Sequence, residues 1–266
     1  MKKRLAIAGC GHLGGIIAGA YAAGLLEGYE LVGAYNRTPE KAEAIAQQTG
    51  CRACTTLEEL LDCAPDYVAE AASVQLVKEI AVPVLSHKAN LVLLSIGALA
   101  DAAFRSEVEA AARENGVQVH IASGAVGGFD VLRTISLMAQ AQGLSEEAGI
   151  VTHKGPQSLK GTPIFTDQLM TDTEESRVLA GTAAEAIAVL PTKVNVAVAA
   201  SLASTGPECA GAQIFSVPGF VGDDHCITAE IDGVHATIDI YSRTADIAGW
   251  STVALLRNLV SPVTFF

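Results

Sequence analysis

The sequence predicts an α/β protein with an N-terminal Rossmann domain, built on a doubly wound parallel sheet, and a second domain of the α+β class. Three observations predict this fold. A short apolar run at residues 4–8 leads directly into Gly9–Gly14, which has the form G-x-G-x-x-G. Strand-like and helix-like segments then alternate as far as residue 122, which is typical of parallel strands covered by helices. Further on, Asp232-Gly233 separates two runs of alternating residues, which predicts an antiparallel hairpin.

The glycine turn has the spacing needed to hold a dinucleotide. Gly9 permits a tight turn, Gly11 lets the backbone approach a pyrophosphate, and Gly14 allows the following helix to pack closely on the strand. The N-terminus of that helix presents free N–H groups and the positive end of its dipole to the phosphates. Glycine-rich turns also occur in proteins for purely structural reasons, but the strand and helix that flank this one indicate nucleotide binding. We therefore expect cofactor contacts from Gly9, Gly11, His12, Leu13 and Gly14.

The end of the second predicted strand, residues 29–35, bears on the choice of cofactor. Asn36-Arg37 follows it, where an NAD-selective site usually carries Asp or Glu on the ribose 2′-hydroxyl. A guanidinium binds a 2′-phosphate through paired donors, which a carboxylate would repel. Asn36 can still bind a hydroxyl. Asn36-Arg37 therefore favours NADP, or the use of both NADP and NAD, over strict use of NAD. The alternative is that Arg37 binds no cofactor and is a solvated residue of the turn before Pro39.

The remaining elements of the first domain alternate in type. Strands are predicted at residues 51–54, 66–71, 90–95 and 117–121, and helices at 56–62, 73–87 and 101–115. Thr56 and Glu59 have the spacing of a capping box, and Gly116 suits the end of a helix. Pro83 lies inside a helical pattern, so we expect a kink or a break there.

The second domain begins at a glycine-rich hinge, residues 123–128, which leads into a helix predicted at 129–141. Asn195 opens another helical pattern, either as its N-cap or as a ligand contact. The hairpin strands are predicted at 227–231 and 234–241, and a last helix at 247–259. We expect a dinucleotide-binding domain at 1–122, an α+β domain at 123–243, and a C-terminal segment, about 244–266, that packs back on the first domain.

Composition narrows the function classes. The net charge of −12 argues against nucleic acid and anionic membrane surfaces as partners. We expect no transmembrane helix, because no apolar run reaches about 18 residues. We expect no signal peptide either, because a strand and the glycine turn follow the basic N-terminus. Cys51 and Cys54 have metal-like spacing without a second pair, so we expect no metal site and six free thiols in a reducing cytoplasm.

A histidine suits proton transfer, because its pKa lies near neutrality. Position leaves His153 and His225 as candidates, both in the second domain. His225 stands at the junction of a loop and a strand, where we expect a side chain that is both exposed and rigidly placed. Lys154 and Lys160 flank a turn-rich loop that could close over an anionic substrate, but solvated lysines are the preferred interpretation.

The chain resembles the L-aspartate dehydrogenase family over most of its length. The more specific matches are Leu94–Asp101 (LSIGALAD) and His120–Gly128 (HIASGAVGG), and the others are the glycine turn, Glu70–Gln75, Lys154–Gly161 and Asn195–Ala197. The resemblance implies NAD(P)-linked oxidative deamination of L-aspartate through iminosuccinate to oxaloacetate and ammonia, and the reverse reaction, feeding NAD biosynthesis. It implies a dicarboxylate substrate and a homodimer. By position, Ala125 and Asn195 match cofactor-contacting residues, and His225 matches the catalytic histidine.

Two departures from the family leave alternatives open. Residues 244–252 replace an Asn-Pro-Lys-Thr-Ser-like stretch that usually precedes the last helix. Asp223 and Asp224 precede His225, where two carboxylates are expected to raise the histidine's pKa and to repel a dianionic substrate. The alternatives are a related NADP-dependent oxidoreductase acting on another amino or oxo acid, and a catalytically silent sensor that binds NADP.

Overall fold

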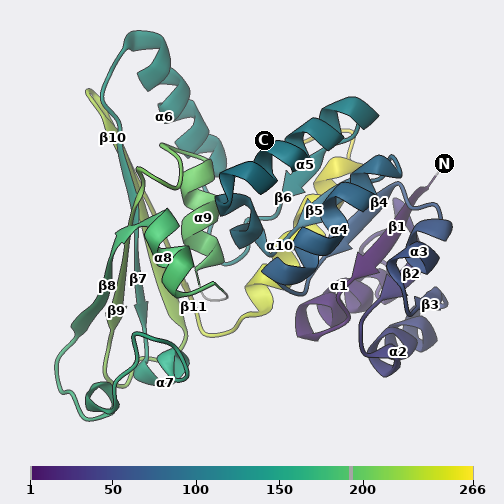
Figure 1. Cartoon of the computed structure of the whole chain (residues 1–266), viewed down its shortest axis with the longest axis horizontal. Helices are drawn as coiled ribbons and strands as arrows, with labels where there is room; N and C mark the ends of the chain where they lie inside the picture. Colours follow the sequence, from purple (N-terminus) through teal and green to yellow (C-terminus); the bar gives the residue numbers. More distant parts are fainter. Residues whose placement is uncertain (1, 192–193, 266) are drawn as a thin grey trace. The chain divides into compact units, whose positions relative to one another are not determined.

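The structure, a computed structural model, describes residues 2–191 and 194–265. The chain divides into two compact units, one formed by Met1–Gly124 with Asp246–Phe266 and the other by Ala125–Ala245. Each unit contains its own sheet (Figure 1) and its own hydrophobic core.

The first unit is built on a six-stranded sheet in the order β3-β2-β1-β4-β5-β6, and every neighbouring pair is parallel. This order is the Rossmann order, so the predicted doubly wound sheet is confirmed. The strands are β1 (Lys3–Ala8), β2 (Tyr29–Tyr35), β3 (Arg52–Cys54), β4 (Tyr67–Glu70), β5 (Asn90–Leu93) and β6 (Val119–Ile121). The helices are α1 (His12–Ala22), α2 (Pro39–Thr49), α3 (Leu57–Asp62), α4 (Val74–Ser86), η1 (Ile96–Ala100), α5 (Ala102–Asn115) and α10 (Asp246–Leu259).

The central strand β1 explains why this sheet is parallel and covered. Leu5, Ala6, Ile7 and Ala8 are all fully buried, so side chains on both faces of the strand are removed from water. A continuous apolar run of this kind fits a strand with helices on both sides and not one with a solvated face. The carboxyl end of β1 therefore carries the glycine turn out of a rigid core.

The C-terminal helix α10 packs on α1 within this unit. A Cβ at Gly249 would lie 2.9 Å from Ile16, so the two helices approach closely at that point. The hydroxyl of Tyr29 donates a hydrogen bond to the carbonyl of Leu256 at 2.8 Å, which fastens α10 to the start of β2. Residues more than 200 apart in sequence thus share one core.

Most local predictions in the first unit are confirmed, and one of the two alternatives at Pro83, a break, is wrong. The hydroxyl of Thr56 accepts a hydrogen bond from the Glu59 N–H at 3.2 Å and the reciprocal bond is present, so the capping box exists. Gly116 ends α5 in the left-handed region at φ 67°. The predicted break at Pro83 is absent, because α4 runs through it to Ser86. Val84 and Leu85 are fully buried, and their packing holds the final turn despite the missing N–H.

The second unit is built on a five-stranded mixed sheet in the order β11-β10-β7-β9-β8. Only the β7–β9 pair is parallel among these strands. The strands are β7 (Glu147–Lys154), β8 (Ser176–Thr182), β9 (Gly211–Ser216), β10 (Asp223–Ile231) and β11 (Val234–Ser242). The helices are α6 (Phe129–Gln142), α7 (Pro156–Leu159), η2 (Asp167–Met170), α8 (Ala183–Val189) and α9 (Asn195–Leu202). The predicted α+β class and the hairpin, with Ile231 opposite Val234, are confirmed.

Helices α6, α8 and α9 lie on one side of this sheet (Figure 1). Ile150 of β7, Ile227 of β10 and Ile214 of β9 are buried on the helix-covered face, which we call the inner face. Alternate residues, such as Thr228 and Thr237, are exposed on the outer face. This alternation is typical of a sheet with one covered side.

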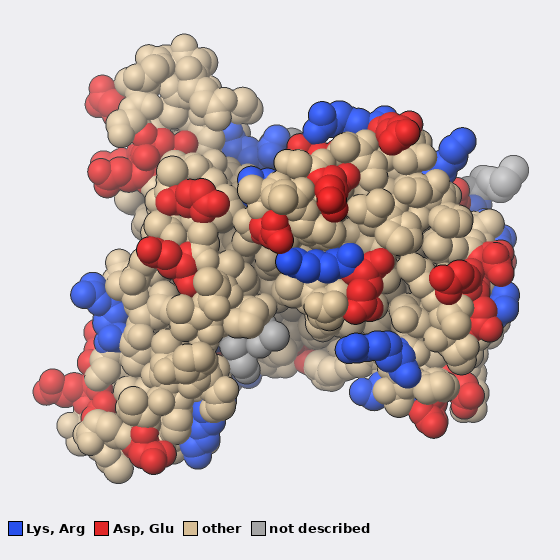
Figure 2. All heavy atoms as spheres, viewed as in Figure 1, with Lys and Arg blue, Asp and Glu red and all other residues tan. Residues whose placement is uncertain are grey.

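Charged side chains of both signs are present on one face of the protein. On the face of the described residues drawn in Figure 2, Lys and Arg are interspersed with Asp and Glu. Within the described ranges, the helices are all too short or too polar to cross a membrane.

Candidate active site

The glycine turn after β1 has the geometry of a phosphate cradle. Gly9 has a φ of +105°, and a Cβ there would lie 2.8 Å from the carbonyl oxygen of Ala71, so only glycine fits. A Cβ at Gly14 would collide with the carbonyl oxygen of Gly9, so α1 packs directly on the turn. A Cβ at Gly11 would meet nothing within 4 Å. That open space, in front of the N-terminus of α1, fits a pyrophosphate.

Asn36 ties the glycine turn to the end of β2. Its Oδ1 accepts a hydrogen bond from the Cys10 N–H at 3.0 Å, and its Nδ2 donates to the carbonyl of Thr38 at 3.2 Å. Asn36 therefore shapes the turn. Arg37 is exposed and has no ion-pair or hydrogen-bond partner among the described residues, so its guanidinium is available to an anion.

The other two residues of the turn differ in exposure. Leu13 is half-buried and packs against the core of the first unit. The His12 ring is exposed, and its Nε2 lies 2.6 Å from Oδ1 of Asp246, the first residue of α10. The nearby Cys10 thiol is not a nucleophile at neutral pH, because burial raises its pKa to about 12.

A second polar group occupies the end of the inner face of the five-stranded sheet. We call Thr152, Lys154, Asp223 and His225 the His225 cluster. In the antiparallel register of β7 and β10, His225 is opposite Thr152 and Asp223 is opposite Lys154, so the four side chains share one face. Nδ1 of His225 lies 2.9 Å from the Thr152 hydroxyl, and Nζ of Lys154 lies 3.2 Å from Oδ1 of Asp223.

The cluster corrects three predictions. His225 is 3% exposed, not an exposed residue at a loop junction, because it continues the buried side of β10. Lys154 is 6% exposed and not solvated, whereas Lys160 is exposed as expected. Burial lowers the pKa of His225 to about 4, and Lys154 adds to the effect while Asp223 opposes it. The expected rise in that pKa is therefore wrong.

Alternation along β10 separates the two aspartates that precede the histidine. Asp224 points to the outer face, opposite His153, whose Nδ1 lies 3.7 Å from its carboxylate. His153 stacks on Phe215 at 5.2 Å between ring centres. Burial and then Asp239 raise the pKa of Asp224. Only Asp223 faces His225, and His153 is on the opposite face from the cluster.

The last two predicted cofactor contacts also lie in the second unit. Ala125 is half-buried at the start of that unit. Asn195 is the first residue of α9, with Val194 as the N-cap, so the N-cap alternative is wrong. Helix α9 packs against β7, the strand that carries Thr152 and Lys154.

Sequence reasoning missed Thr152 and the burial of Lys154, although a signal existed. Ile150, Thr152 and Lys154 follow one another at every second position of β7, so all three share the inner face. Two polar residues that continue an apolar face at the end of a strand mark a place where buried polar groups meet.

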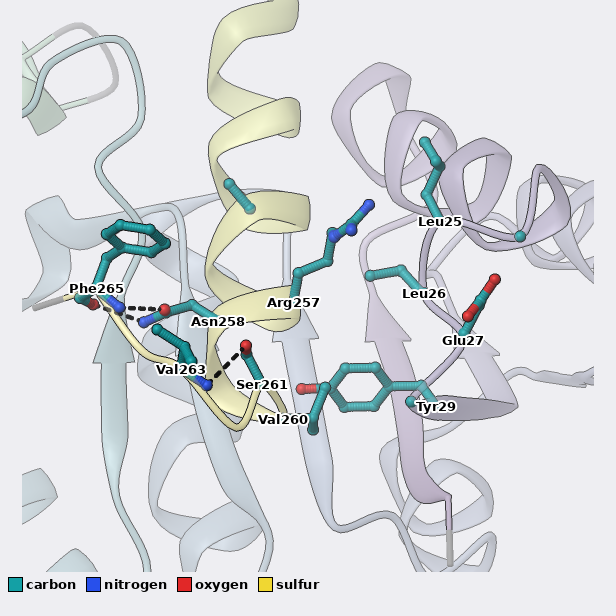
Figure 3. Close-up of a pocket in the computed structure, with 13 residues that line it drawn as sticks. Leu25, Leu26, Glu27, Tyr29, Arg257, Asn258, Val260, Ser261, Val263 and Phe265 are labelled. Carbon is teal, nitrogen blue, oxygen red and sulfur yellow. Dashed lines mark hydrogen bonds between the residues drawn. The ribbon is translucent and has the colours of Figure 1, made fainter.

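A pocket of about 630 Å³ in the first unit lies away from the glycine turn (Figure 3). It is lined by the segment from Gly24 to Tyr29 and by the end of α10 with the tail that follows, including Arg257 and Phe265. Asn258 binds the backbone of Phe265 through two hydrogen bonds and thereby folds the tail back. The pocket is at the amino end of β2, whereas the glycine turn follows the carboxyl end of β1.

A Rossmann unit with an intact glycine turn, joined to a unit with a buried histidine–lysine cluster, defines a two-domain dehydrogenase. Residues 135–259 match the family model described as "Aspartate dehydrogenase, C-terminal", and residues 9–122 match "Homoserine dehydrogenase, NAD binding domain". The chain belongs to the L-aspartate dehydrogenase family, because it is more than 30% identical to a member of that family over most of its length.

Individual relatives agree with this assignment. The chain is 31% identical to the L-aspartate dehydrogenase of Acinetobacter baylyi over 85% of this chain and 88% of that protein. It is 29% identical to an L-aspartate dehydrogenase of Methanococcus maripaludis over 98% of both chains. The crystal structure of aspartate dehydrogenase from Thermotoga maritima is 24% identical over 100% of both chains, with a TM-score of 0.80, and shares the fold.

Proposed function

We propose that this protein is an NAD(P)-dependent L-aspartate dehydrogenase that oxidises L-aspartate through iminosuccinate to oxaloacetate and ammonia, and catalyses the reverse reaction. The observation that best supports this proposal is the buried His225 cluster in a chain of this family. The cluster supplies a proton acceptor and a cation in one place. When bound, the nicotinamide ring accepts a hydride from C2 of the substrate.

His225 is proposed as the base of the reaction. In the tautomer whose Nδ1–H donates to the Thr152 hydroxyl, Nε2 carries the lone pair and is the ring nitrogen for proton transfer. Burial lowers the pKa of His225 to about 4, so the ring is neutral near neutral pH, and the carboxylates of a bound substrate would raise that pKa toward the range useful for proton transfer. It would take a proton from the substrate ammonium group, so that the amine lone pair can assist departure of the hydride. After releasing that proton to solvent, it would take a second proton, in the hydrolytic step, from the water that attacks the imine carbon.

Lys154 is proposed to hold a substrate carboxylate. An ammonium has three N–H donors, and Asp223 accepts from only one side of it. Because Lys154 is buried, water screens its attraction to a substrate carboxylate poorly, although Asp223 offsets part of its charge. Asp223 in turn holds the ammonium group of Lys154 toward the cluster.

The cofactor is proposed to bind along the glycine turn, with Gly9, Gly11, His12, Leu13 and Gly14 at the pyrophosphate. Asn36 and Arg37 would stand at the adenosine ribose; the free guanidinium and the lack of an acidic residue there favour NADP, with NAD also accepted. Ala125 and Asn195 are proposed contacts on the resemblance to the family.

We also propose a homodimer in the cytoplasm. The family resemblance supports the dimer through the second unit, whose sheet has helices on one side and carries Tyr241, 51% exposed, on the other. The six cysteines are all described and all free, which fits a reducing compartment.

The test is oxidation of NADPH and NADH with oxaloacetate and ammonia, followed by absorbance and repeated without ammonia. Ammonia-dependent oxidation is expected. Oxidation without ammonia would identify a keto-acid reductase instead. Nucleotide binding without turnover on a panel of amino and oxo acids would favour a silent sensor.

A further inference from the structure

Glu70 is a buried acidic residue that the reaction scheme does not use. It ends β4 and is 0% exposed. Acidic side chains are almost never fully buried unless they are paired, and this one lacks a cationic partner among the described residues. Its carboxylate instead accepts five hydrogen bonds.

The five donors come from two different loops. Oε1 accepts from the Ala72 N–H at 2.7 Å and the Ser73 N–H at 2.9 Å, both in the loop after β4. Oε2 accepts from the Ser95 N–H at 2.9 Å and the Leu94 N–H at 3.4 Å, in the loop after β5. The Ser95 hydroxyl also donates to Oε1, at 2.9 Å. One carboxylate therefore joins two loops at the carboxyl edge of the parallel sheet.

The position of Glu70 in the sheet connects it to the nucleotide. The strand order reverses between β1 and β4, and ligands of such sheets bind in the crevice outside the carboxyl ends at that point. The loop after β4 packs on the glycine turn, because a Cβ at Gly9 would lie 2.6 Å from Cβ of Ala72. The Ala71 N–H also donates to the carbonyl of Ala8 at 2.9 Å.

We propose that Glu70 is a positioning residue of the nucleotide site, whose carboxylate holds the loops after β4 and β5 in the arrangement that the cofactor meets. This inference rests on the proposed binding of NAD(P) at the glycine turn. This position requires a carboxylate. All four backbone partners are N–H donors, two from each loop, and only a group with two acceptor oxygens can accept hydrogen bonds from both loops.

The test is Glu70→Gln, which keeps the size of the side chain. A glutamine has one carbonyl oxygen, so its NH₂ group must face either the N–H groups of Ala72 and Ser73 or those of Leu94 and Ser95. One of the two loops then loses its acceptor. We expect the dissociation constant of NADPH, measured by ligand fluorescence, to rise roughly 10- to 100-fold, the size of a lost hydrogen bond to a charged group. The KM for the cofactor should rise accordingly, with kcat at saturation much less changed.

A matched control is Asp66→Asn, the same change just before the other end of β4. The side chain of Asp66 accepts one hydrogen bond, from the Arg4 N–H to Oδ2 at 2.7 Å, which an amide oxygen also satisfies. We expect this variant to bind NADPH like the wild type. Amide hydrogen exchange of the nucleotide-free proteins should be faster in Glu70→Gln at Ala72 and Ser73 or at Leu94 and Ser95, and unchanged at those residues in the control.

Each result has a definite meaning. A folded Glu70→Gln protein with the wild-type dissociation constant would overturn the inference, as would an equal loss of affinity in Asp66→Asn. If Glu70→Gln does not fold, Ser95→Ala removes one donor and should still raise the dissociation constant several-fold; an unchanged constant would overturn the inference. A wild-type protein that binds neither NADPH nor NADH would contradict the proposed function instead.

Discussion

The buried His225 makes the stability of the second unit sensitive to acid. Its pKa falls from 6.5 to about 4 in the folded chain, mainly because burial disfavours the charged ring. As the pH drops below 6.5, the unfolded chain takes up a proton that the folded chain refuses until about pH 4. The stability associated with His225 is therefore complete above pH 6.5 and is lost progressively as the pH falls through this window.

The size of the loss follows from the width of that window. At about 1.4 kcal/mol per pH unit, the shift from 6.5 to about 4 corresponds to about 3 kcal/mol once the window has been crossed. About 2 kcal/mol of this is lost by about pH 5. The perturbation is His225→Asn, whose side chain can keep the hydrogen bond to Thr152 but does not titrate. We expect the variant to lack this part of the pH dependence.

The assay is urea unfolding of the wild type and the variant, monitored by circular dichroism at about pH 5 and at about pH 7.5. The change in unfolding free energy between the two pH values is then compared between the two proteins. Circular dichroism is needed because the single tryptophan, Trp250, lies in the first unit. Glu70 and Asp224 have raised pKa values and act in the opposite direction, but they are present in both proteins and cancel. Identical changes of stability with pH in the two proteins would refute the buried, neutral histidine.

Three further predictions concern catalysis and the cofactor. His225→Ala should lower turnover at least about 100-fold while the dissociation constant of NADPH stays unchanged; near-normal turnover would remove the histidine from the mechanism. Arg37→Ala should weaken NADP roughly 10- to 100-fold and NAD much less, and equal losses in a binding titration would show that Arg37 does not contact the 2′-phosphate. Gly11→Ala should leave the melting temperature of the nucleotide-free protein unchanged, because its Cβ meets open space, yet weaken NADPH by roughly tenfold or more; Gly14→Ala, which collides with the carbonyl of Gly9, should lower that melting temperature.

The features that the sequence determined by itself are local ones. The glycine turn, the capping box at Thr56, the end of α5 at Gly116 and the hairpin at Asp232-Gly233 each depend on the backbone preferences of a few adjacent residues. Alternation of polar and apolar residues predicted the second sheet for the same reason, since a strand shows its two faces in its own sequence. The family resemblance added the proposed cofactor contact at Ala125, and it favoured a cofactor contact for Asn195 and the catalytic role for His225, both of which position alone had left open.

The tertiary structure alone decided which residues are buried together. Lys154 is an ordinary lysine in the sequence, and it becomes a buried partner of Asp223 only because β10 pairs with β7 under a layer of helices. His12 and Asp246 meet although 234 residues separate them, and the donors to Glu70 come from two loops. Burial and pKa depend on strand order and on which helix covers which face. Strand order and helix coverage depend in turn on the packing of the whole unit. The lowered pKa of His225 was therefore not predictable from its neighbours in the chain.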